Sequence, residues 1–529
     1  MSVTSPTGPI AGAGHAPGSG TSLLADLVWL RSFTAGEQPF AEEARSDRVL
    51  TYAGLRRAAV RWRGVLTDLG VEVGGTVGLA ISSPVDFASV YIATIAAGRV
   101  AAPLDPNAPD PELRTTCDRV LPALVVADRP APPDVSCEWL ALPTGSFELD
   151  DGNGAGRPSP WAPLPTGLFR ERGPVPLGGL VLSTSGTTGA PKVIRLSEGQ
   201  LLHTAGSVAA HHRLSTVDRG LNSLPLFHVN AEVVGLLSTL VAGATLVLDD
   251  RFHRTGFWDL ARRRGVTWIN AVPAVISRLT PLEPGETVPS GVRFVRSASA
   301  PLPPATLARF EEATGLPVVE SYGMTEAGSQ ITANPLGGPR KPGSVGLPVG
   351  LELRVVAGEG LAGRVEIRGA GVVSGCGSTG LEHRVEPDGG WLDTGDLGYL
   401  DADGYLYLVG RVDDVINRGG EKIHPREVEE VLLSADPRVT AAAVVGHDRH
   451  ELGQVPVAYL VLDGVVHAED GGLAAGIVER VQTHCVQFLA RPKRPVAFHV
   501  VNRLPAGATG KIRRTMIDPQ STIYSLLAG

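Results

Sequence analysis

The 529-residue chain has few cysteines and no excess of basic residues. Its four cysteines include no CxxC pair, which disfavours a disulfide framework or a zinc site and favours free thiols in a reducing cytoplasm. The formal net charge is −8, so the composition predicts neither a nucleic-acid-binding surface nor attraction to anionic lipid. These absences leave an ordinary globular protein, with 43% hydrophobic and 19% charged residues.

A long apolar segment is also absent. The longest apolar run, 233–248, is interrupted by Ser238, Thr239 and Gly243 and is too short for a membrane-spanning helix. It predicts a buried helix, a glycine turn and a buried strand. The first twenty residues lack a basic segment followed by an apolar one, so they predict a disordered tail rather than a secretory signal.

The remaining sequence predicts two folding units. Apolar runs at 75–81 and 266–272 are separated by stretches compatible with helices, which is typical of an α/β unit with a largely parallel sheet. From Trp391 onward, short strands with Asp and Gly turns precede a helix candidate at 425–435, which indicates a smaller α+β unit. We expect a tail over 1–20, a large domain over 21–411 and a small domain over 412–529.

The segment LVLSTSGTTGAPKVI carries the strongest local signal for phosphate binding. Hydroxyls, flexible glycines and a cation follow an apolar strand, and together they can cradle an anion. The residues concerned are Ser183, Thr184, Ser185, Gly186, Thr187, Thr188, Gly189 and Lys192. The segment lacks the GK[ST] ending of a Walker loop, and a plain polar turn is the alternative interpretation.

Together with four further segments, this loop resembles the adenylate-forming superfamily of acyl- and aryl-CoA synthetases, luciferases and peptide-synthetase adenylation domains. The segments are PLFHVNAE (225–232), ESYGMTEA (320–327), DTGD (393–396) with 410–432, and LPAGATGKIRR (504–514). Their order matches the family, and the resemblance spans about residues 50–514. It implies a large N-terminal domain of parallel and mixed sheets with flanking helices, and a small mobile C-terminal α+β domain.

The resemblance also implies a nucleotide site. Tyr322 would stack on adenine, Asp396 would accept hydrogen bonds from the ribose hydroxyls, and Arg411 would reach the ribose or a phosphate. Thr325 would contact the α-phosphate and Glu326 would hold Mg²⁺, a hard cation that prefers carboxylate oxygen. The other implied ATP- or AMP-binding residues are Thr184, Ser185, Gly186, Thr187, Thr188, Gly189, Lys192, Ser299, Ala300, Pro301, Ser321, Gly323 and Met324.

For the chemistry itself, the resemblance implies that Lys511 is the catalytic cation, on a loop of the small domain. A positioned ammonium offsets the negative charge that builds when a carboxylate attacks a phosphate. Asp413 would be the hinge between the domains, with Gly419 and Gly420 beside a tunnel for the pantetheine arm of coenzyme A.

The implied acid pocket contains His228, Asn230, Ser297, Gly323 and Ser329. His228 is equally compatible with a role as a core residue. Oxalate–CoA ligases, which this chain resembles in places, tend to carry a His where Ser329 stands. Because a site without a cation-capable partner holds a second carboxylate poorly, we expect a monocarboxylic acid with an apolar or aromatic body.

The expected function is therefore an ATP-dependent acid–CoA ligase using ATP, Mg²⁺ and CoA. The alternatives are a ligase that loads a separate carrier protein, an adenylate-only or luciferase-like enzyme, and a binding protein without turnover. The sequence predicts a cytoplasmic location and carries no signal for the oligomeric state. The loop over 371–390 differs from the usual family pattern, and no function follows from that difference.

Overall fold

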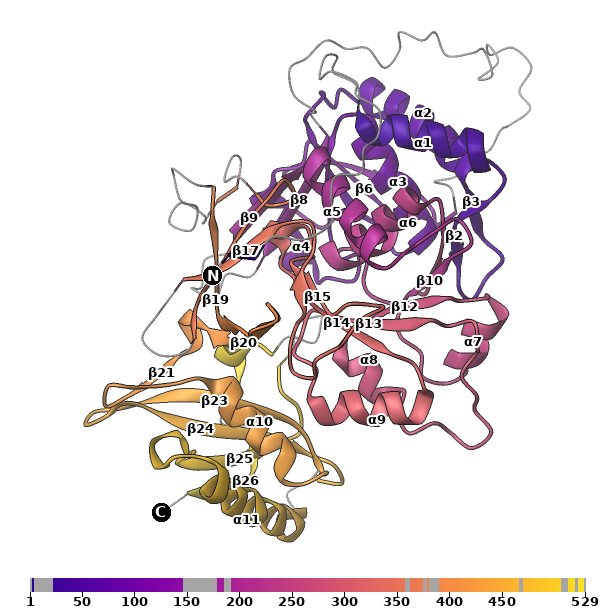
Figure 1. Ribbon diagram of the computed structural model, residues 1–529. Coiled ribbons are helices and arrows are strands. Elements are labelled where there is room, and N and C mark those ends of the chain that lie inside the picture. The colour runs from indigo at the N-terminus through magenta and orange to yellow at the C-terminus, as the bar shows by residue number, and fades with distance from the viewer. Residues whose placement is uncertain are drawn as a thin grey trace, which may run out of the picture.

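The computed structural model describes residues 2–3, 22–145, 178–184, 192–356, 362–373, 378–379, 390–465, 470–505, 512–518 and 522–527. The chain forms a large N-terminal part and a smaller C-terminal part (Figure 1). Within the described residues, no helix combines the length and apolar character needed to cross a membrane.

The first sheet of the large part is parallel except for its last pair of strands. Its first strand along the chain, at 76–80, is buried throughout because layers cover the sheet on both sides, which confirms the strand expected within 75–81. In spatial order the strands are β7 (Glu138–Ala141), β6 (Leu124–Ala127), β4 (Thr76–Ala80), β5 (Val100–Pro103), β8 (Gly179–Thr184) and β9 (Lys192–Ser197). The associated helices are α1 (Leu23–Ala35), α2 (Tyr52–Asp68), α3 (Pro84–Ala96) and α4 (Asp110–Val120).

The second sheet has nine strands and carries the site at one edge. Its strands are β16 (Leu347–Pro348), β15 (Thr332–Ala333), β14 (Val318–Tyr322), β13 (Phe294–Ser297), β12 (Trp268–Ala271), β10 (Arg219–Asn222), β11 (Thr245–Leu248), β2 (Pro39–Glu43) and β3 (Val49–Thr51). The six strands from β14 to β2 are parallel, so the carboxyl ends of β10, β12, β13 and β14 meet at the same edge. β12 confirms the strand expected within 266–272.

The helices around this sheet follow the sequence pattern. The apolar run at 233–248 forms the end of the π-helix η1 (Asn230–Leu237), then α6 (Ser238–Ala242), a turn at Gly243 and strand β11, as expected. Gly243 has φ +72°, a left-handed conformation that favours glycine. The other helices are α5 (Glu198–His211), α7 (Phe257–Arg263), α8 (Pro273–Arg278), α9 (Pro304–Thr314) and the 3₁₀ turn η2 (Thr325–Ala327).

A third, antiparallel sheet joins the large part to the C-terminal part. It contains β1 (Ser2–Val3), β17 (Glu352–Val356), β18 (Gly363–Arg368), β19 (Leu392–Leu400) and β20 (Leu406–Arg411). The antiparallel strands expected after Trp391 are confirmed in β19 and β20. Ser2 and Val3 pair with β17, so this end of the expected tail is in a strand, and residues 4–21 lie outside the described ones.

The C-terminal part is an α+β unit with its own core. Its strands are β22 (Glu421–Ile423), β21 (Ile416–Arg418), β24 (Gly453–Leu462), β25 (Ala497–Val501) and β26 (Thr522–Leu527), with β23 (Val439–Arg449) on β24. Its helices are α10 (Pro425–Ala435) and α11 (Gly471–Phe488), with the 3₁₀ turns η5 (Arg491–Lys493) and η6 (Arg514–Met516). Helix α10 has the bounds predicted for it, and its apolar face packs into the core of this unit.

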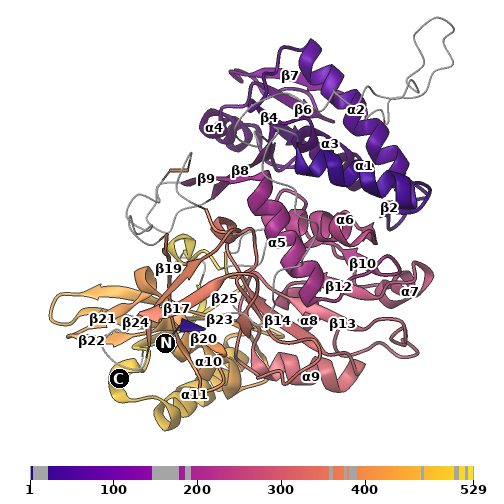
Figure 2. The same cartoon turned by 45° about the horizontal axis from the view of Figure 1, so that its top comes forward.

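A short connection leads the chain from the third sheet to the sheet of the C-terminal unit. β20 ends the third sheet at Arg411, the 3₁₀ turn η3 (Val412–Asp414) follows, and β21 begins the fourth sheet. In both views the C-terminal unit lies at one end of the molecule, beside β19 and β20 (Figure 2). The expected hinge residue, Asp413, is exposed within this connection.

Candidate active site

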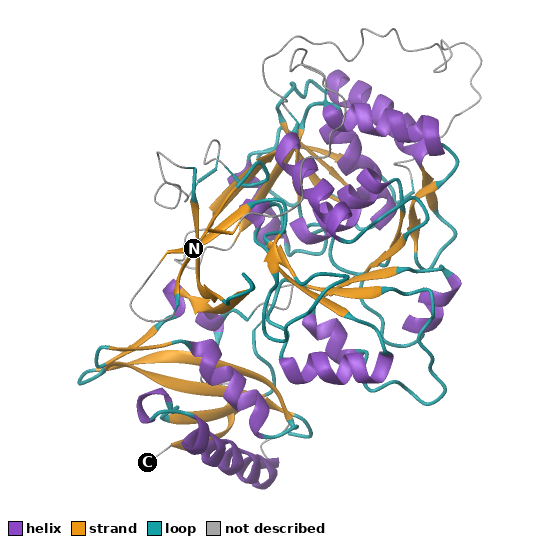
Figure 3. Cartoon of the chain, viewed as in Figure 1, coloured by secondary structure: helices purple, strands orange, loops and turns teal. Residues whose placement is uncertain are grey.

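The predicted site residues gather where strands end and loops begin. The loops after β13 and β14 lie between the second sheet and the third, close to β19 and β20 (Figure 3). In parallel sheets the carboxyl ends of the strands are the usual place for ligands, because loops there can present side chains from several strands.

Three residues predicted to bind the nucleotide are linked by hydrogen bonds, with Asp396 accepting from the other two. The Tyr322 hydroxyl donates a hydrogen bond to Oδ2 of Asp396, and Nη1 of Arg411 donates to Oδ1 of the same carboxylate at 3.1 Å. Burial, together with the negative charge of Asp396, raises the pKa of Tyr322 well above its usual value, so the hydroxyl stays a donor at neutral pH. The carboxylate is thereby held in one orientation from two sides. A carboxylate fixed in this way suits a pair of ribose hydroxyls, and the neighbouring tyrosine ring suits a purine.

Glu326 provides the buried carboxylate of the site. It lies in η2, directly after Thr325, and its side chain is 7% exposed. Its backbone oxygen accepts a hydrogen bond from the amide of Val373 at 2.8 Å, which ties η2 to the segment after β18. The chemistry of this donor fits Mg²⁺, which binds one or two protein carboxylates and otherwise keeps water and phosphate oxygens.

The turn after β14 folds back tightly over Gly323. The amide of Ile331 donates to the carbonyl of Tyr322 at 2.8 Å, which closes the turn. A Cβ atom on Gly323 would lie 2.0 Å from the carbonyl oxygen of Ser329, so this position requires glycine. Ser329 itself is buried and has φ +77°. The structure therefore brings together two of the residues expected in the acid pocket.

The loop after β13 is held from both sides. The Ser321 hydroxyl donates to the carbonyl of Ser297 at 3.2 Å, and Nδ2 of Asn230 donates to Oγ of Ser299 at 3.2 Å. Ser299 has φ +73°, in the left-handed region that favours glycine. Ala300 is half-buried and Pro301 is exposed.

His228 stands two residues before Asn230, yet no hydrogen bond from its ring reaches another predicted site residue in the described part of the chain. Its Nε2 is buried without a hydrogen-bond partner there, and its ring centroid lies 4.7 Å from that of Phe227. Burial lowers the pKa of His228 to about 4, so the ring is neutral at pH 7. These features fit both a core residue and a residue of the acid pocket.

Sequence reasoning missed a polar network that includes Asn230, one of the residues expected in the acid pocket. Arg296, the third residue of β13, donates to the side-chain oxygens of Asn230, Asn270 and Gln330. A signal was present, because an arginine inside the apolar strand FVRS is unusual for a strand buried on both faces.

Some predicted residues lie outside the described ones: Ser185, Gly186, Thr187, Thr188 and Gly189 of the phosphate loop, and Lys511. The residues that flank the loop are placed, since Thr184 and Lys192 are paired at the end of the β8–β9 hairpin. Gly419 and Gly420 form the tight turn between β21 and β22, with φ +60° and +92°. Two adjacent left-handed residues are what a two-residue hairpin turn requires.

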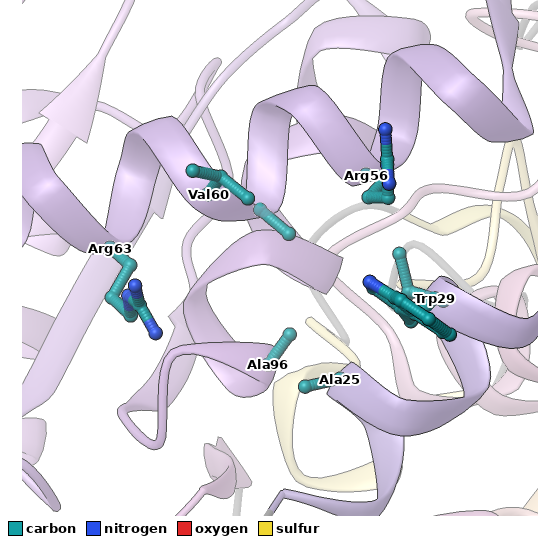
Figure 4. A pocket seen from close by; sticks show the side chains of 8 residues that line it. Ala25, Trp29, Arg56, Val60, Arg63 and Ala96 are labelled. Atoms are coloured by element: carbon teal, nitrogen blue, oxygen red, sulfur yellow. The ribbon is translucent and has the colours of Figure 1, made fainter. Parts of the chain in front are cut away.

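One small pocket of the described residues lies elsewhere and does not belong to this site. It measures about 20 Å³ and lies between α1, α2 and the end of α3 (Figure 4). Its lining includes Trp29, Arg56 and Arg63, and none of the predicted site residues. This volume is close to that of a single water molecule, so the pocket is too small for a nucleotide or an acid.

Comparison with known proteins agrees with this geometry. The sequence matches the AMP-binding enzyme family over residues 33–376 and the AMP-binding enzyme C-terminal domain over residues 427–511. It is 34% identical over 515 residues to sulfoacetate–CoA ligase of Cupriavidus necator, covering 93% of this chain and 96% of that protein. It is 35% identical over 493 residues to oxalate–CoA ligase of Arabidopsis thaliana, covering 88% and 93% of the two chains.

A solved structure of a CoA synthetase is similar to this chain over nearly its whole length. The o-succinylbenzoate CoA synthetase of Bacillus subtilis, in complex with its acyl-adenylate intermediate, superposes with a TM-score of 0.77 at 28% identity, covering 94% of this chain and 98% of that one. The matches include both the large part and the C-terminal unit. The chain therefore belongs to the AMP-binding, or adenylate-forming, enzyme family, among its AMP-forming acid–CoA ligases.

Proposed function

We propose that the protein is a cytoplasmic enzyme that uses MgATP to activate an organic acid as its acyl-adenylate and then transfers the acyl group to the thiol of CoA. The observation that carries the proposal is the carboxylate of Asp396, held by Tyr322 and Arg411. The relatives named as CoA ligases support the choice of acceptor.

In the first half-reaction an oxygen of the acid's carboxylate attacks the α-phosphorus of ATP. The bond from this phosphorus to the bridging oxygen breaks, and pyrophosphate leaves with the electron pair. Tyr322 would stack on adenine, Asp396 would hold the ribose, and Thr325 would contact the α-phosphate. Lys511 and the loop between Thr184 and Lys192 would oppose the negative charge that builds on the phosphate oxygens.

Glu326 would hold the metal ion. Mg²⁺ bound there would neutralise phosphate charge and orient the pyrophosphate leaving group. Because Glu326 lies one residue after Thr325 in η2, a single turn would set the position of both the metal and the α-phosphate contact.

In the second half-reaction the thiol sulfur attacks the acyl carbonyl carbon. The thiol gives up its proton, and AMP leaves with the electron pair of the broken carbon–oxygen bond. Rotation of the C-terminal unit about Asp413 would withdraw Lys511 and bring the Gly419–Gly420 turn to the pantetheine arm. A short exposed connection between two sheets is suited to absorb such a rotation. Free CoA is the proposed acceptor rather than a carrier protein.

The class of acid that the enzyme activates is a separate part of the proposal. The prediction of a monocarboxylic acid with an apolar or aromatic body depends on Ser329, which stands where oxalate–CoA ligases tend to carry a histidine. Arg296 bonds to Asn230 and to Gln330, the residue after Ser329, so a cation is present near these residues. Kinetics with matched monoanionic and dianionic acids distinguish the two substrate classes.

The reaction is tested with purified protein, MgATP, CoA and short-chain, aromatic and long-chain acids, each with one or two anionic groups. Release of AMP and pyrophosphate is followed, with Lys511→Ala as the inactive control. Formation of AMP that requires both acid and CoA, and falls at least ~100-fold in the variant, is the expected result. Release of pyrophosphate without a thioester would indicate an adenylate-only enzyme or a carrier-protein acceptor. An absence of acid-dependent turnover would contradict the proposal.

A further inference from the structure

Arg296 is a fully buried cation whose described partners are all neutral. Its side chain is 0% exposed. Nη1 donates to Oδ1 of Asn230 at 3.1 Å and to Oδ1 of Asn270 at 3.2 Å, and Nη2 donates to Oε1 of Gln330 at 3.0 Å. No carboxylate of the described residues forms an ion pair with it. The three acceptors are amide oxygens, which carry no charge.

This arrangement is costly for folding. Taking a guanidinium out of water without a counter-ion costs several kcal/mol, and a Leu or Met of similar volume would avoid that cost. Burial lowers the pKa of Arg296 only to about 9, so the group keeps its charge at neutral pH. A buried charge that does not serve stability indicates a ligand of opposite charge.

The histidines near Arg296 do not contribute further charge. Burial is the main cause that lowers the pKa of His211 to about 4 and that of His212 well below its usual value. The positive charges of Arg296, of Arg213 for His211 and of Arg293 for His212 act in the same direction. Both rings are therefore neutral at pH 7. Neither histidine therefore adds a positive charge beside Arg296.

The guanidinium also keeps unused donors. It has five N–H groups, and three of them have the acceptors named above. Nε is buried and has no acceptor among the described residues, and Nη2 makes one described bond. Nε and Nη2 form one edge of the guanidinium plane, and such an edge matches two oxygens of a carboxylate or sulfonate.

The network includes or adjoins residues expected in the acid pocket. Asn230 bonds both to Arg296 and to Oγ of Ser299 in the adenine-lining loop. Gln330 directly follows Ser329, and Ser297 directly follows Arg296. Asn270 is in turn bonded to Asn222, so the amides at the carboxyl ends of β10 and β12 hold the cation at this edge of the sheet.

We propose that Arg296 recognises a second anionic group of the acid, so that the substrate carries the carboxylate that is activated and, at its far end, another carboxylate or a sulfonate. This inference rests on the proposed function and names the substrate class for the same site. Sulfoacetate and oxalate, for which two relatives are named, each carry two anionic groups. Arg296 on β13 would thus bind the second anionic group, which the uncharged Ser329 cannot neutralise.

The test compares acids that differ in one anionic group. Succinate is paired with butyrate, sulfoacetate with propionate, and 2-succinylbenzoate with 4-oxo-4-phenylbutanoate. Acid-dependent exchange of pyrophosphate into ATP gives kcat/KM for each acid, with the wild type, Arg296→Met and Arg296→Lys. Melting temperatures establish that the variants are folded.

In at least one pair the wild type is expected to have a kcat/KM about 100-fold or more higher for the dianionic acid. The monoanionic acid would leave the buried cation of Arg296 unpaired. Arg296→Met should lose most of this preference through a lower kcat/KM for the dianion, with little change for its partner, and Arg296→Lys should keep part of it. A wild-type preference for the monoanionic member of every active pair overturns the inference, and this comparison does not depend on how the variants fold. An equal loss for both acids in a folded Arg296→Met also overturns it, because it indicates a structural role. Exchange with monoanionic acids alone leaves the proposed function standing, whereas exchange with no acid contradicts both.

Discussion

Tyr322 donates a hydrogen bond from its hydroxyl to Oδ2 of Asp396, so the last residue of β14 is joined directly to the middle of β19. Oδ1 of the same carboxylate accepts from Arg411, 3.1 Å away on β20. Two separate sheets therefore position one carboxylate. The orientation of Asp396 depends on a contact between segments 74 residues apart in the sequence.

Removal of this hydroxyl in Tyr322→Phe should weaken ATP binding while keeping a flat ring against adenine. A hydrogen bond to a charged group contributes about 1.5–3 kcal/mol, so we expect KM for ATP to rise roughly 10-fold or more, with a smaller change in kcat. Steady-state kinetics at saturating acid and CoA measure both constants. Tyr407→Phe, at a half-buried position of β20 that stacks on Tyr399, is the matched control and should change neither constant. An unaltered KM in Tyr322→Phe would show that the hydroxyl does not orient the ribose-binding carboxylate.

The metal role proposed for Glu326 predicts that activity depends on the Mg²⁺ concentration. Glu326→Gln keeps the shape of the side chain and removes its charge, so we expect kcat/KM to fall by about 100-fold or more at low Mg²⁺ and to recover partly as Mg²⁺ is raised. A magnesium titration of pyrophosphate exchange measures this. Glu112→Gln, at an exposed position of α4, should behave as the wild type. A loss that no concentration of Mg²⁺ reduces would point to a role other than metal binding.

Much of the fold follows from local pattern. The strand β4, the helix α10 and the helix–turn–strand at 233–248 were predictable because apolar runs, glycine turns and a proline at a helix start act over a few residues. The expectation that Tyr322, Asp396 and Arg411 share one site came from a different source. They stand in short segments whose order matches a known family, and the structure brings these three side chains together.

The network around Arg296 could not be predicted in the same way. Asn222, Asn270 and Arg296 stand near the ends of three strands, and only the parallel order of β10, β12 and β13 brings them together. Ser299 and Ser329 are also unpredictable locally, because nothing in a serine indicates a left-handed backbone. Such features depend on tertiary structure, which overrides local preference.

The turn at Gly323 predicts a sharp intolerance. In Gly323→Ala the new methyl group would overlap the carbonyl of Ser329, which is backbone and cannot turn aside as a side chain can. We expect a loss of stability of about 2 kcal/mol or more and a large fall in pyrophosphate exchange, measured by thermal unfolding and by kinetics. Gly206→Ala, in α5 with nothing within 4 Å of the new atom, should instead be neutral or stabilising by up to about 1 kcal/mol. Equal stability of the two variants would contradict this account of the turn.

Glu320 couples pH to stability where β14 faces the C-terminal unit. Its side chain is 4% exposed, and burial raises its pKa to about 7 against the smaller opposing effects of Arg426 on α10 and the amide of Leu302. In the unfolded chain the pKa of this carboxyl lies near 4.5, the ordinary value for glutamate. Between these two values the native state binds more protons than the unfolded state, so this group makes the protein less stable as pH rises, and the full penalty is present above pH 7.

Glu320→Gln removes that penalty and keeps a side-chain oxygen that can accept from Leu302. We expect the variant to melt at a higher temperature than the wild type at pH 8, by an amount that corresponds to about 1–3 kcal/mol, and to show little difference at pH 4.5. Thermal unfolding at the two pH values measures this. Glu312→Gln, at an exposed position of α9, controls for the loss of one negative charge and should show no such pH dependence. If Glu320→Gln instead destabilised the protein at pH 8, the ionised carboxylate would be stabilising there, and its attraction to Arg426 would outweigh its burial.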